Sequence, residues 1–306
     1  MNKMLIVIVG PTGIGKSDTA IEIAQRLSTE IISADSRQLY KEIPITTAAP
    51  TDEDLKKVRH HLIGTLNLHD YYSASEFEED ALKKIREIHL KSDYAVMCGG
   101  SMMYVDAVCS GIDDIPTIPQ EIRDRLLEEY NTKGDEWLRS ELLRLDPIYY
   151  NQVDLKNIKR VIHAVEICIA AGKPYSDLRQ GIKKKREFDI LKIGLTASRE
   201  YIFDRINCRT HKMIEAGMIK EAQNVYHLRH LNSLNTVGFK EIFKFFDGEW
   251  DLETAVSRLQ KNTRVYAKKQ MTWFKRDPEI NWFNVEVAKK ELTDQIMTKI
   301  AEFTNH

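Results

Sequence analysis

The chain has few cysteines and no long hydrophobic run. Its four cysteines stand apart, without C-x-x-C spacing, and its histidines do not cluster; the cysteines are Cys98, Cys109, Cys168 and Cys208. A zinc site or a disulfide framework is therefore not expected, and reduced thiols are the expectation. The first apolar run is too short to span a membrane, and the N-terminus does not resemble a signal peptide. We expect a cytoplasmic protein without a membrane contact.

The chain also lacks an excess of either charge. Lys and Arg number 45, Asp and Glu number 46, and the formal net charge is −1. A nucleic acid could therefore bind only at a local basic patch, because the molecule has no overall positive field. The length of 306 residues allows one large domain with an insertion, or two domains.

Residues 10–17 match the phosphate-binding pattern G-x-x-x-x-G-K-[ST] at every fixed position. An apolar run over 4–9 precedes them and predicts a buried strand, and apolar residues at helical spacing follow. Such a turn directs backbone N–H groups and the positive end of a helix dipole at one point. We expect a bound di- or triphosphate, with the Ser17 hydroxyl as a ligand of Mg²⁺. The phosphate-binding residues are expected to be Gly10, Thr12, Gly13, Gly15, Lys16 and Ser17.

Two further short apolar runs, at 30–34 and 94–98, predict strands, and an apolar stripe over 75–91 predicts a helix capped by Ser75. Strand, helix and strand in this order predict right-handed βαβ units and a parallel sheet. Lys16, Asp35 and Ser101 each follow the end of such a strand. Because ligands of these folds bind beyond the carboxyl ends of the strands, we expect the three residues to lie together in an α/β protein.

The pattern changes near residue 113. A proline-punctuated connection covers 115–119, and amphipathic helices without a clear strand follow it to about residue 180. A return to the sheet is expected at 191–195, then helices that include 199–229 and 251–275. We therefore expect a P-loop core of residues 1–118 plus 184–306 and an all-helical insertion domain at 119–183. The basic run 183–186 is expected to be a solvated turn.

The residues beside the phosphate site narrow the chemistry. Most P-loop enzymes hold Mg²⁺ with an aspartate at a strand end, but here the third strand ends in Gly99-Gly100-Ser101. That difference weakens a kinase or ATPase interpretation and fits a diphosphate leaving group. Asp35 is placed to accept a proton as a general base, with a helix cap or turn residue as the alternative. The Ser101 hydroxyl could bind the leaving oxygen, with an ordinary helix N-cap as the alternative.

The segment 258–276 is basic and contains no acidic residue. Four of its cations fall near one helical face, with aromatic residues interleaved; they are Lys261, Arg264, Lys268 and Lys275. This pattern favours contact with a nucleic-acid backbone and stacked bases over an ordinary solvated face, which usually carries both charges.

At this point the chain resembles the tRNA dimethylallyltransferases (tRNA isopentenyltransferases). The similar segments run through nearly the whole sequence. They are GPTGIGKS at 10–17, ADSRQLYKEI at 34–43, ITTAAP at 45–50, HHL at 60–62, YSASEF at 72–77, GGSMMY at 99–104, VGFKE at 237–241 and NTRVYAKKQMTWFKR at 262–276. Many families share the P-loop, whereas the other segments in this order are far more specific.

The resemblance implies transfer of a dimethylallyl group from dimethylallyl diphosphate to the exocyclic amine of the adenosine 3′ of the anticodon. Asp35 would take the amine proton, Ser101 would contact the bridging oxygen, and Arg209 would stabilise the leaving group. The P-loop and Mg²⁺ would hold the diphosphate. The target base would be flipped out of its loop, and the helical insertion would grip the anticodon stem-loop. Expected tRNA contacts are Gln38, Lys261, Arg264, Lys268 and Gln270, in a protein that we expect to be a monomer.

Some positions depart from the family's usual pattern. Ser101 replaces a threonine, Ala49 replaces a lysine, Lys156-Asn157 stand where Asn-Asp is usual, and His163 replaces an arginine. These departures suggest a divergent member and concern its rate and its set of tRNAs more than its fold or reaction class.

Three rival functions stay open on the sequence. A small-molecule or nucleotide kinase would use the P-loop for ATP. A prenyltransferase that acts on free adenine nucleotides would not need the basic segment 258–276. A catalytically weakened, RNA-binding member of the family would be consistent with the departures, but Lys16, Ser17 and Asp35 are intact.

Overall fold

The computed structural model describes residues 3–113, 115–116, 118–179, 181 and 183–304. Their contacts divide them into two compact units, one with the residues up to Cys109 and from Arg186 onward, the other with Ser110–Lys185. The first boundary lies nine residues before the one expected at 118/119, and the second lies two residues after the one expected at 183/184. Residues 114, 117, 180 and 182, which fall in the expected connection and near the end of the expected insertion, lie outside the described residues.

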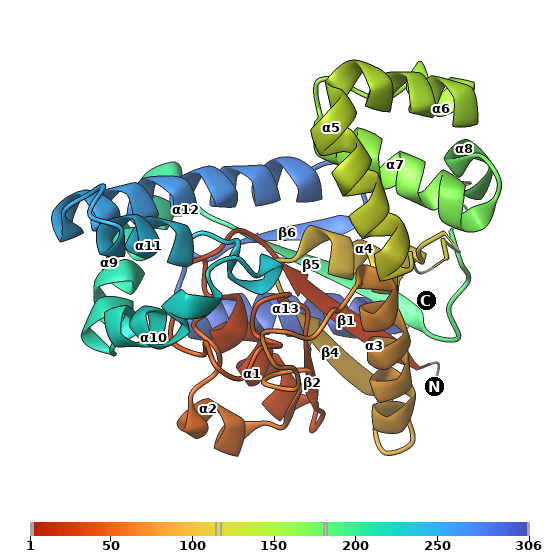
Figure 1. The fold of residues 1–306 in the computed structure, drawn as a ribbon. Coiled ribbons are helices and arrows are strands. Elements are labelled where there is room, and N and C mark those ends of the chain that lie inside the picture. Colours follow the sequence, from red (N-terminus) through yellow and green to blue (C-terminus); the bar gives the residue numbers. More distant parts are fainter. Residues whose placement is uncertain (1–2, 114, 117, 180, 182, 305–306) are drawn as a thin grey trace. The chain divides into compact units, whose positions relative to one another are not determined.

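The larger unit is built on a six-stranded sheet in which every described strand pair is parallel. The spatial order is β3-β2-β4-β1-β5-β6 (Figure 1). The strands are β1 (Met4–Val9), β2 (Ile31–Ser33), β3 (His60–His61), β4 (Tyr94–Cys98), β5 (Asp189–Thr196) and β6 (Ile280–Asn284). The predicted α/β fold with a parallel sheet is therefore confirmed.

Helices pack on both faces of this sheet, as the fully buried central strand requires. Ile6 and Ile8 of β1 pack with residues of α1 (Lys16–Arg26), α9 (Arg199–Glu215) and α13 (Lys289–Thr304). Leu5 and Val7 point the other way and pack with α3 (Ala74–His89) and α4 (Met102–Ser110). Alternate residues of one strand thus supply the cores of both faces.

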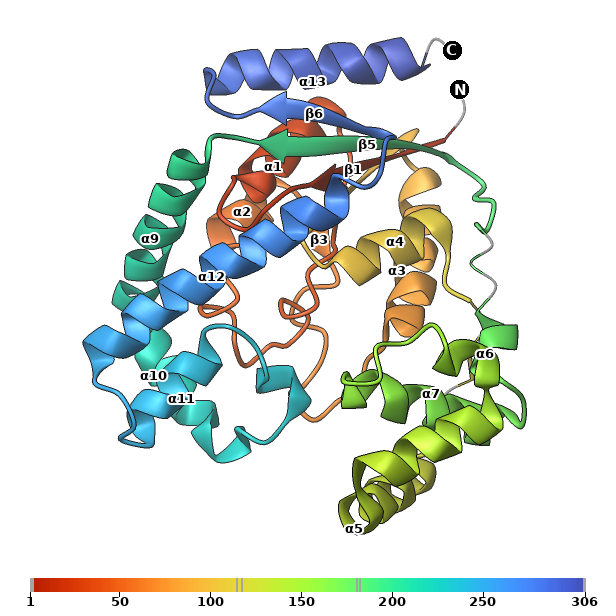
Figure 2. The ribbon, with the colours of Figure 1, turned by 90° about the horizontal axis from the view of Figure 1, so that it is seen from above.

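Beyond the carboxyl ends of the strands, further helices extend the larger unit. β5 leads directly into α9, and α12 (Leu252–Phe274) runs beside it (Figure 2). A third apolar core joins α10 (Met218–Val225), α11 (Phe239–Phe246) and the first half of α12 to the segment that follows β2. The short helix α2 (Asp52–Lys57) belongs to the segment after β2. Two 3₁₀ turns, Tyr226–Leu228 and Asn232–Leu234, lie between α10 and α11.

Several local predictions differ from the structure. The helix expected over 199–229 is two helices, because Gly217 has a φ of 105° and starts α10 anew. α3 is capped by Ser73, whose side chain accepts from the Glu76 amide, and Ser75 lies inside the helix. Arg186 is buried 2.7 Å from Glu78, so the basic run 183–186 does not end in a solvated turn. The strands β3 and β6 and the helix α13 were not foreseen.

The smaller unit is helical in its described residues. It contains α5 (Gln120–Leu145), which kinks at Gly134, and α6 (Pro147–Tyr150), α7 (Ile158–Ala171) and α8 (Tyr175–Leu178). An apolar core of its own holds these helices together. The fully buried carboxylate of Asp146 accepts from the amides of Tyr149 and Ser176 at 2.9 and 2.7 Å and so joins α6 to α8.

No helix among the described residues combines the length and the apolarity that a membrane span needs.

Candidate functional site

The P-loop connects β1 to α1 with the geometry that its glycines permit. Gly15 has a φ of 104° and forms the N-cap of α1, so Lys16 and Ser17 occupy the first turn. A side chain at Gly10 would place its Cβ 2.8 Å from the carbonyl oxygen of Leu195. Gly10 therefore allows the loop to start close against β5. It does not line the pocket described next, whereas the other predicted phosphate-binding residues do.

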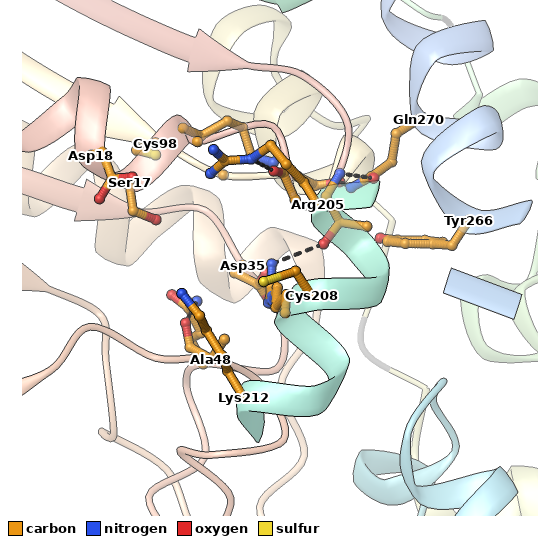
Figure 3. Close-up of a pocket in the computed structure, with 18 residues that line it drawn as sticks. Ser17, Asp18, Asp35, Ala48, Cys98, Arg205, Cys208, Lys212, Tyr266 and Gln270 are labelled. Atoms are coloured by element: carbon orange, nitrogen blue, oxygen red, sulfur yellow. Dashed lines mark hydrogen bonds between the residues drawn. The ribbon is translucent and has the colours of Figure 1, made fainter. Parts of the chain in front are cut away.

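The loop opens onto a pocket of about 410 Å³, which we call the P-loop pocket (Figure 3). Residues from β1, β2 and β4 reach it just past their carboxyl ends, and α9 and α12 contribute the opposite side. Its lining carries two carboxylates and four cations, which are Asp18, Asp35, Lys16, Arg205, Arg209 and Lys212. This excess of positive charge suits an anion with several charges.

Lys16 is a partly buried cation of this pocket. Its Nζ donates to the carbonyl oxygen of Pro11 at 2.9 Å. Burial is the main cause that lowers the pKa of Lys16 to about 8; the neighbouring charge of Arg209 acts in the same direction, and Cys98 and Asp35 act against it. Burial also raises the pKa of the Cys98 thiol to about 12, so this cysteine stays neutral. An arriving anion would restore the full charge of Lys16.

Asp35 stands two residues after β2, at the junction of two pockets. One carboxylate oxygen accepts from the Arg37 amide at 2.9 Å, which fixes the side chain. Asp35 lines the P-loop pocket and also a second pocket of about 370 Å³, which we call the neighbouring pocket. Both pockets are also lined by Thr12, Arg209 and Tyr266. Asp35 therefore lies where the two pockets adjoin.

Arg209 is held at this junction by the P-loop itself. Its Nη1 donates to Oγ1 of Thr12 at 3.1 Å. Burial lowers the pKa of Arg209, and the charge of Asp35 opposes that shift. Burial likewise raises the pKa of Tyr266 to about 12, so the phenol stays protonated. The junction thus combines a carboxylate with a cation that the P-loop holds in place.

Ser101 lines the neighbouring pocket and not the P-loop pocket. Its Oγ accepts from the Ser36 amide at 2.8 Å and lies 3.2 Å from Oγ of Ser36. These bonds tie the start of α4 to the segment that carries Asp35. The predicted contact of Ser101 with the bridging oxygen of a diphosphate stays a prediction, as does the alternative of an N-cap.

The predicted tRNA-binding residues fall in different places. Lys261, Arg264 and Lys268 line a third hollow of about 520 Å³, the basic groove, together with Arg199 and Lys275. Its lining includes no acidic residue and, in the part of the chain that the structure describes, no residue of the other two pockets. Arg264 is partly committed, because its Nη1 donates to Asn207 at 2.9 Å.

The two predicted glutamines bind the protein itself. Gln270 is only 2% exposed; it accepts from the Thr12 amide and donates to the carbonyl oxygen of Gly100, both at 2.8 Å. Gln38 accepts from the Ser33 hydroxyl at 3.0 Å and donates to the Ala48 carbonyl at 3.1 Å. Both ends of the Gln270 amide are paired within the protein, and the residue lines the P-loop pocket. The tRNA contacts predicted for Gln270 and Gln38 stay predictions.

Sequence reasoning missed several residues of the pocket, among them Arg205, Cys208 and Lys212. They lie on α9 with Arg209, and their spacing of three, four and seven residues places all four on one helical face (Figure 3). That spacing was visible in the sequence once Arg209 had been chosen. Ala49 stands where the family usually has a lysine, so its loop supplies no cation to the pocket. The lining includes Ala48 of this loop and Lys212 of α9.

Comparison with known proteins agrees with this architecture. A family model described as IPP transferase matches residues 38–277. The tRNA dimethylallyltransferase 2 of Parabacteroides distasonis is 53% identical over 296 residues, which cover 96% of this chain and 99% of that protein. The tRNA dimethylallyltransferase 1 of Bacteroides fragilis is 54% identical over 291 residues, which cover 95% of this chain and 97% of that protein.

Solved structures resemble the whole chain as well. The tRNA isopentenylpyrophosphate transferase of Bacillus halodurans superposes with a TM-score of 0.72 at 34% identity, covering 99% of this chain and 96% of that one. A eukaryotic dimethylallyltransferase described as acting on tRNA has a TM-score of 0.80 at 25% identity, covering 92% of this chain and 74% of that one.

Proposed function

The chain belongs to the IPP transferase family, and on that premise we propose that it transfers a dimethylallyl group from dimethylallyl diphosphate to tRNA. The acceptor is the exocyclic amine of the adenosine 3′ of the anticodon, and diphosphate is released. We propose a cytoplasmic location for this activity, because its acceptor is tRNA. The relatives whose names carry this activity match nearly the full length of the chain.

The observation that carries the proposal is the junction of the two pockets at Asp35. The P-loop pocket is suited to a diphosphate, and the neighbouring pocket opens beside it with a lining rich in hydroxyls. A prenyl donor in the first and a flipped adenine in the second would present the allylic carbon to the amine beside Asp35, Thr12 and Arg209. Bringing two reactants together in this way removes much of the entropic barrier.

The reaction needs one bond to form and one to break. The adenine amine nitrogen bonds to C1 of the dimethylallyl group while the C1–O bond to the diphosphate breaks, and the electron pair leaves with the diphosphate. Asp35 accepts the proton that the amine loses. Arg209, fixed by Thr12 at 3.1 Å, and Lys16 stabilise the negative charge that develops on the leaving oxygens.

Mg²⁺ fits this pocket as a partner of the diphosphate. The Ser17 hydroxyl and the Asp18 carboxylate both line it, and no group of three metal-ligating His, Cys, Asp or Glu residues occurs in the described ranges. Magnesium commonly takes few protein ligands and most of its oxygens from phosphate and water. When bound, it would neutralise diphosphate charge, with Ser17 as its protein ligand.

The rest of the tRNA would be held outside the junction. We assign the helical unit Ser110–Lys185 to the anticodon stem-loop, as the family resemblance implies. The basic groove is assigned to the RNA backbone, because it combines five cations with apolar residues and lacks a carboxylate. Phe203 in its lining lies under the guanidinium groups of Arg199 and Arg264.

The test uses purified protein, radiolabelled dimethylallyl diphosphate, Mg²⁺ and unmodified tRNA whose anticodon is followed by adenosine. Parallel reactions replace tRNA with AMP, replace the prenyl donor with ATP, or use tRNA with guanosine at the acceptor position. Label should enter only the tRNA that has adenosine at the acceptor position.

The other outcomes separate the rival functions. Transfer to AMP would identify an enzyme acting on free nucleotides, and phosphoryl transfer from ATP would identify a kinase. Binding of tRNA without any transfer would identify an RNA-binding member that has lost catalysis.

A further inference from the structure

We propose that Lys212 is a diphosphate-binding residue, which closes the P-loop pocket from the side opposite the loop. The inference rests on the proposed function, since it names a further contact of the same donor. Lys212 lines the pocket with Ser17 and Asp18 of α1 across from it. It extends from α9 toward Ala48, where a small side chain leaves space (Figure 3).

Lys212 is set apart from the other cations of the pocket by its lack of a partner. Arg205 donates to the Gly13 carbonyl oxygen at 2.6 Å, Arg209 donates to Thr12, and Lys16 donates to Pro11. The side chain of Lys212 makes no hydrogen bond or ion pair with any residue that the structure describes, and Lys212 is exposed. Its ammonium group is therefore available to an incoming anion without breaking an existing bond.

The position of Lys212 also fits the shape of a P-loop ligand. It follows Arg209 by almost one helical turn, so it lies about 5 Å farther along α9 on the same face. The loop amides and Lys16 hold a diphosphate from one side. A flexible lysine on the other side can reach the outer phosphate oxygens, because its ammonium is a point charge on a four-carbon stem. Lys212 thereby sets the affinity for donor and for released diphosphate.

The test measures the affinity of inorganic pyrophosphate with Mg²⁺ by calorimetry on the full chain. It compares the unchanged protein with Lys212→Met, Lys212→Arg and Lys220→Met. Lys220 lies on α10, is exposed, and does not line the P-loop pocket. Its substitution makes the same change of net charge and so controls for long-range electrostatics. Thermal unfolding of each variant shows whether the fold is retained.

We expect Lys212→Met to weaken pyrophosphate binding about tenfold, as the loss of one charge-assisted hydrogen bond would. Lys212→Arg should restore most of the affinity, and Lys220→Met should change it by less than about twofold. In the transfer assay, KM for dimethylallyl diphosphate should rise with Lys212→Met while KM for tRNA stays unchanged.

Three results would overturn the proposal. Equal affinity in Lys212→Met and the unchanged protein would show that Lys212 does not touch the diphosphate, and equal losses in both methionine variants would reduce its effect to net charge. If the unchanged protein binds no pyrophosphate, the proposed function fails along with this inference. A loss confined to Lys212→Met supports both.

Discussion

The backbone amide of Thr12 donates a hydrogen bond of 2.8 Å to Oε1 of Gln270, although 258 positions separate the two residues. Nε2 of the same Gln270 side chain donates to the Gly100 carbonyl oxygen at 2.8 Å. One buried side chain therefore holds together the P-loop, the end of β4 and α12. These three segments form the lining on which the diphosphate would lie, so their spacing depends on Gln270.

Replacement of Gln270 by leucine should destabilise the fold and the site together. The substitution removes the side-chain amide of Gln270, so the Thr12 amide and the Gly100 carbonyl both lose their hydrogen bonds. Each buried group left unsatisfied costs about 1–3 kcal/mol. We expect the free energy of unfolding in urea to fall by about 2–6 kcal/mol for the pair, and pyrophosphate affinity to fall as well. Gln223→Leu, at an exposed position on α10, should leave both unchanged.

A result that contradicts this account is equally clear. If Gln270→Leu keeps the stability of the unchanged protein but loses tRNA affinity, the glutamine binds tRNA directly, as the sequence first suggested.

Asp35 is expected to act on the chemical step and not on binding. In the unchanged protein Asp35 accepts from the Arg37 amide at 2.9 Å. Asp35→Asn keeps an oxygen that can accept this bond, but it removes the basic carboxylate. Turnover should fall by about 10²–10⁴-fold, while tRNA affinity, measured by filter binding, stays within a few-fold. Asp52→Asn, in the exposed first turn of α2, is the matched control. Unchanged turnover in Asp35→Asn would remove Asp35 from the role of base.

The parts of this site that follow from local sequence could be predicted. The P-loop is a contiguous pattern, and Asp35 and Ser101 follow strands whose apolar runs are easily recognised. Because parallel strands end at one edge, their convergence needed no tertiary detail. Arg209 entered only through the family resemblance.

The parts that depend on packing could not be predicted. Gln270 looks like one polar residue of a basic helix, and only the placement of α12 against the P-loop turns it inward. Arg186 stands in a run of lysines, yet it is buried against Glu78, because a remote helix supplies the carboxylate. β3 has two residues, too few for a periodic signal. The break at Gly217 was passed over because the apolar pattern continues on both sides.

The lowered pKa of Lys16 predicts how anion binding depends on pH. Burial lowers this pKa to about 8 in the free protein, and a bound anion favours the charged form and so raises it. The contribution of Lys16 to pyrophosphate affinity, measured without metal, should therefore be constant below about pH 8. It should fall as the pH rises above this value, by up to about tenfold per pH unit, since the free protein must then take up a proton to bind.

The control for this effect is Lys16→Arg, whose guanidinium stays charged over the same range. Protonation of pyrophosphate itself affects both proteins equally, so the ratio of their affinities isolates Lys16. A ratio that does not change between pH 7 and 10 would contradict the lowered pKa.

The basic groove should contribute to tRNA binding through charge alone. Lys261→Gln with Lys268→Gln removes two cations from its lining and spares Arg264, which also binds Asn207. If each lysine neutralises one phosphate, the slope of log affinity against log salt should become shallower by about 1.4–1.8. Pyrophosphate affinity should not change, because the groove and the P-loop pocket have no described lining residue in common.

The double variant Lys220→Gln with Lys290→Gln removes the same charge from exposed positions on α10 and α13 and should leave the slope unchanged. An equal change of slope in both double variants would mean that tRNA senses only the net charge, and an unchanged slope in both would place the RNA backbone elsewhere on the protein.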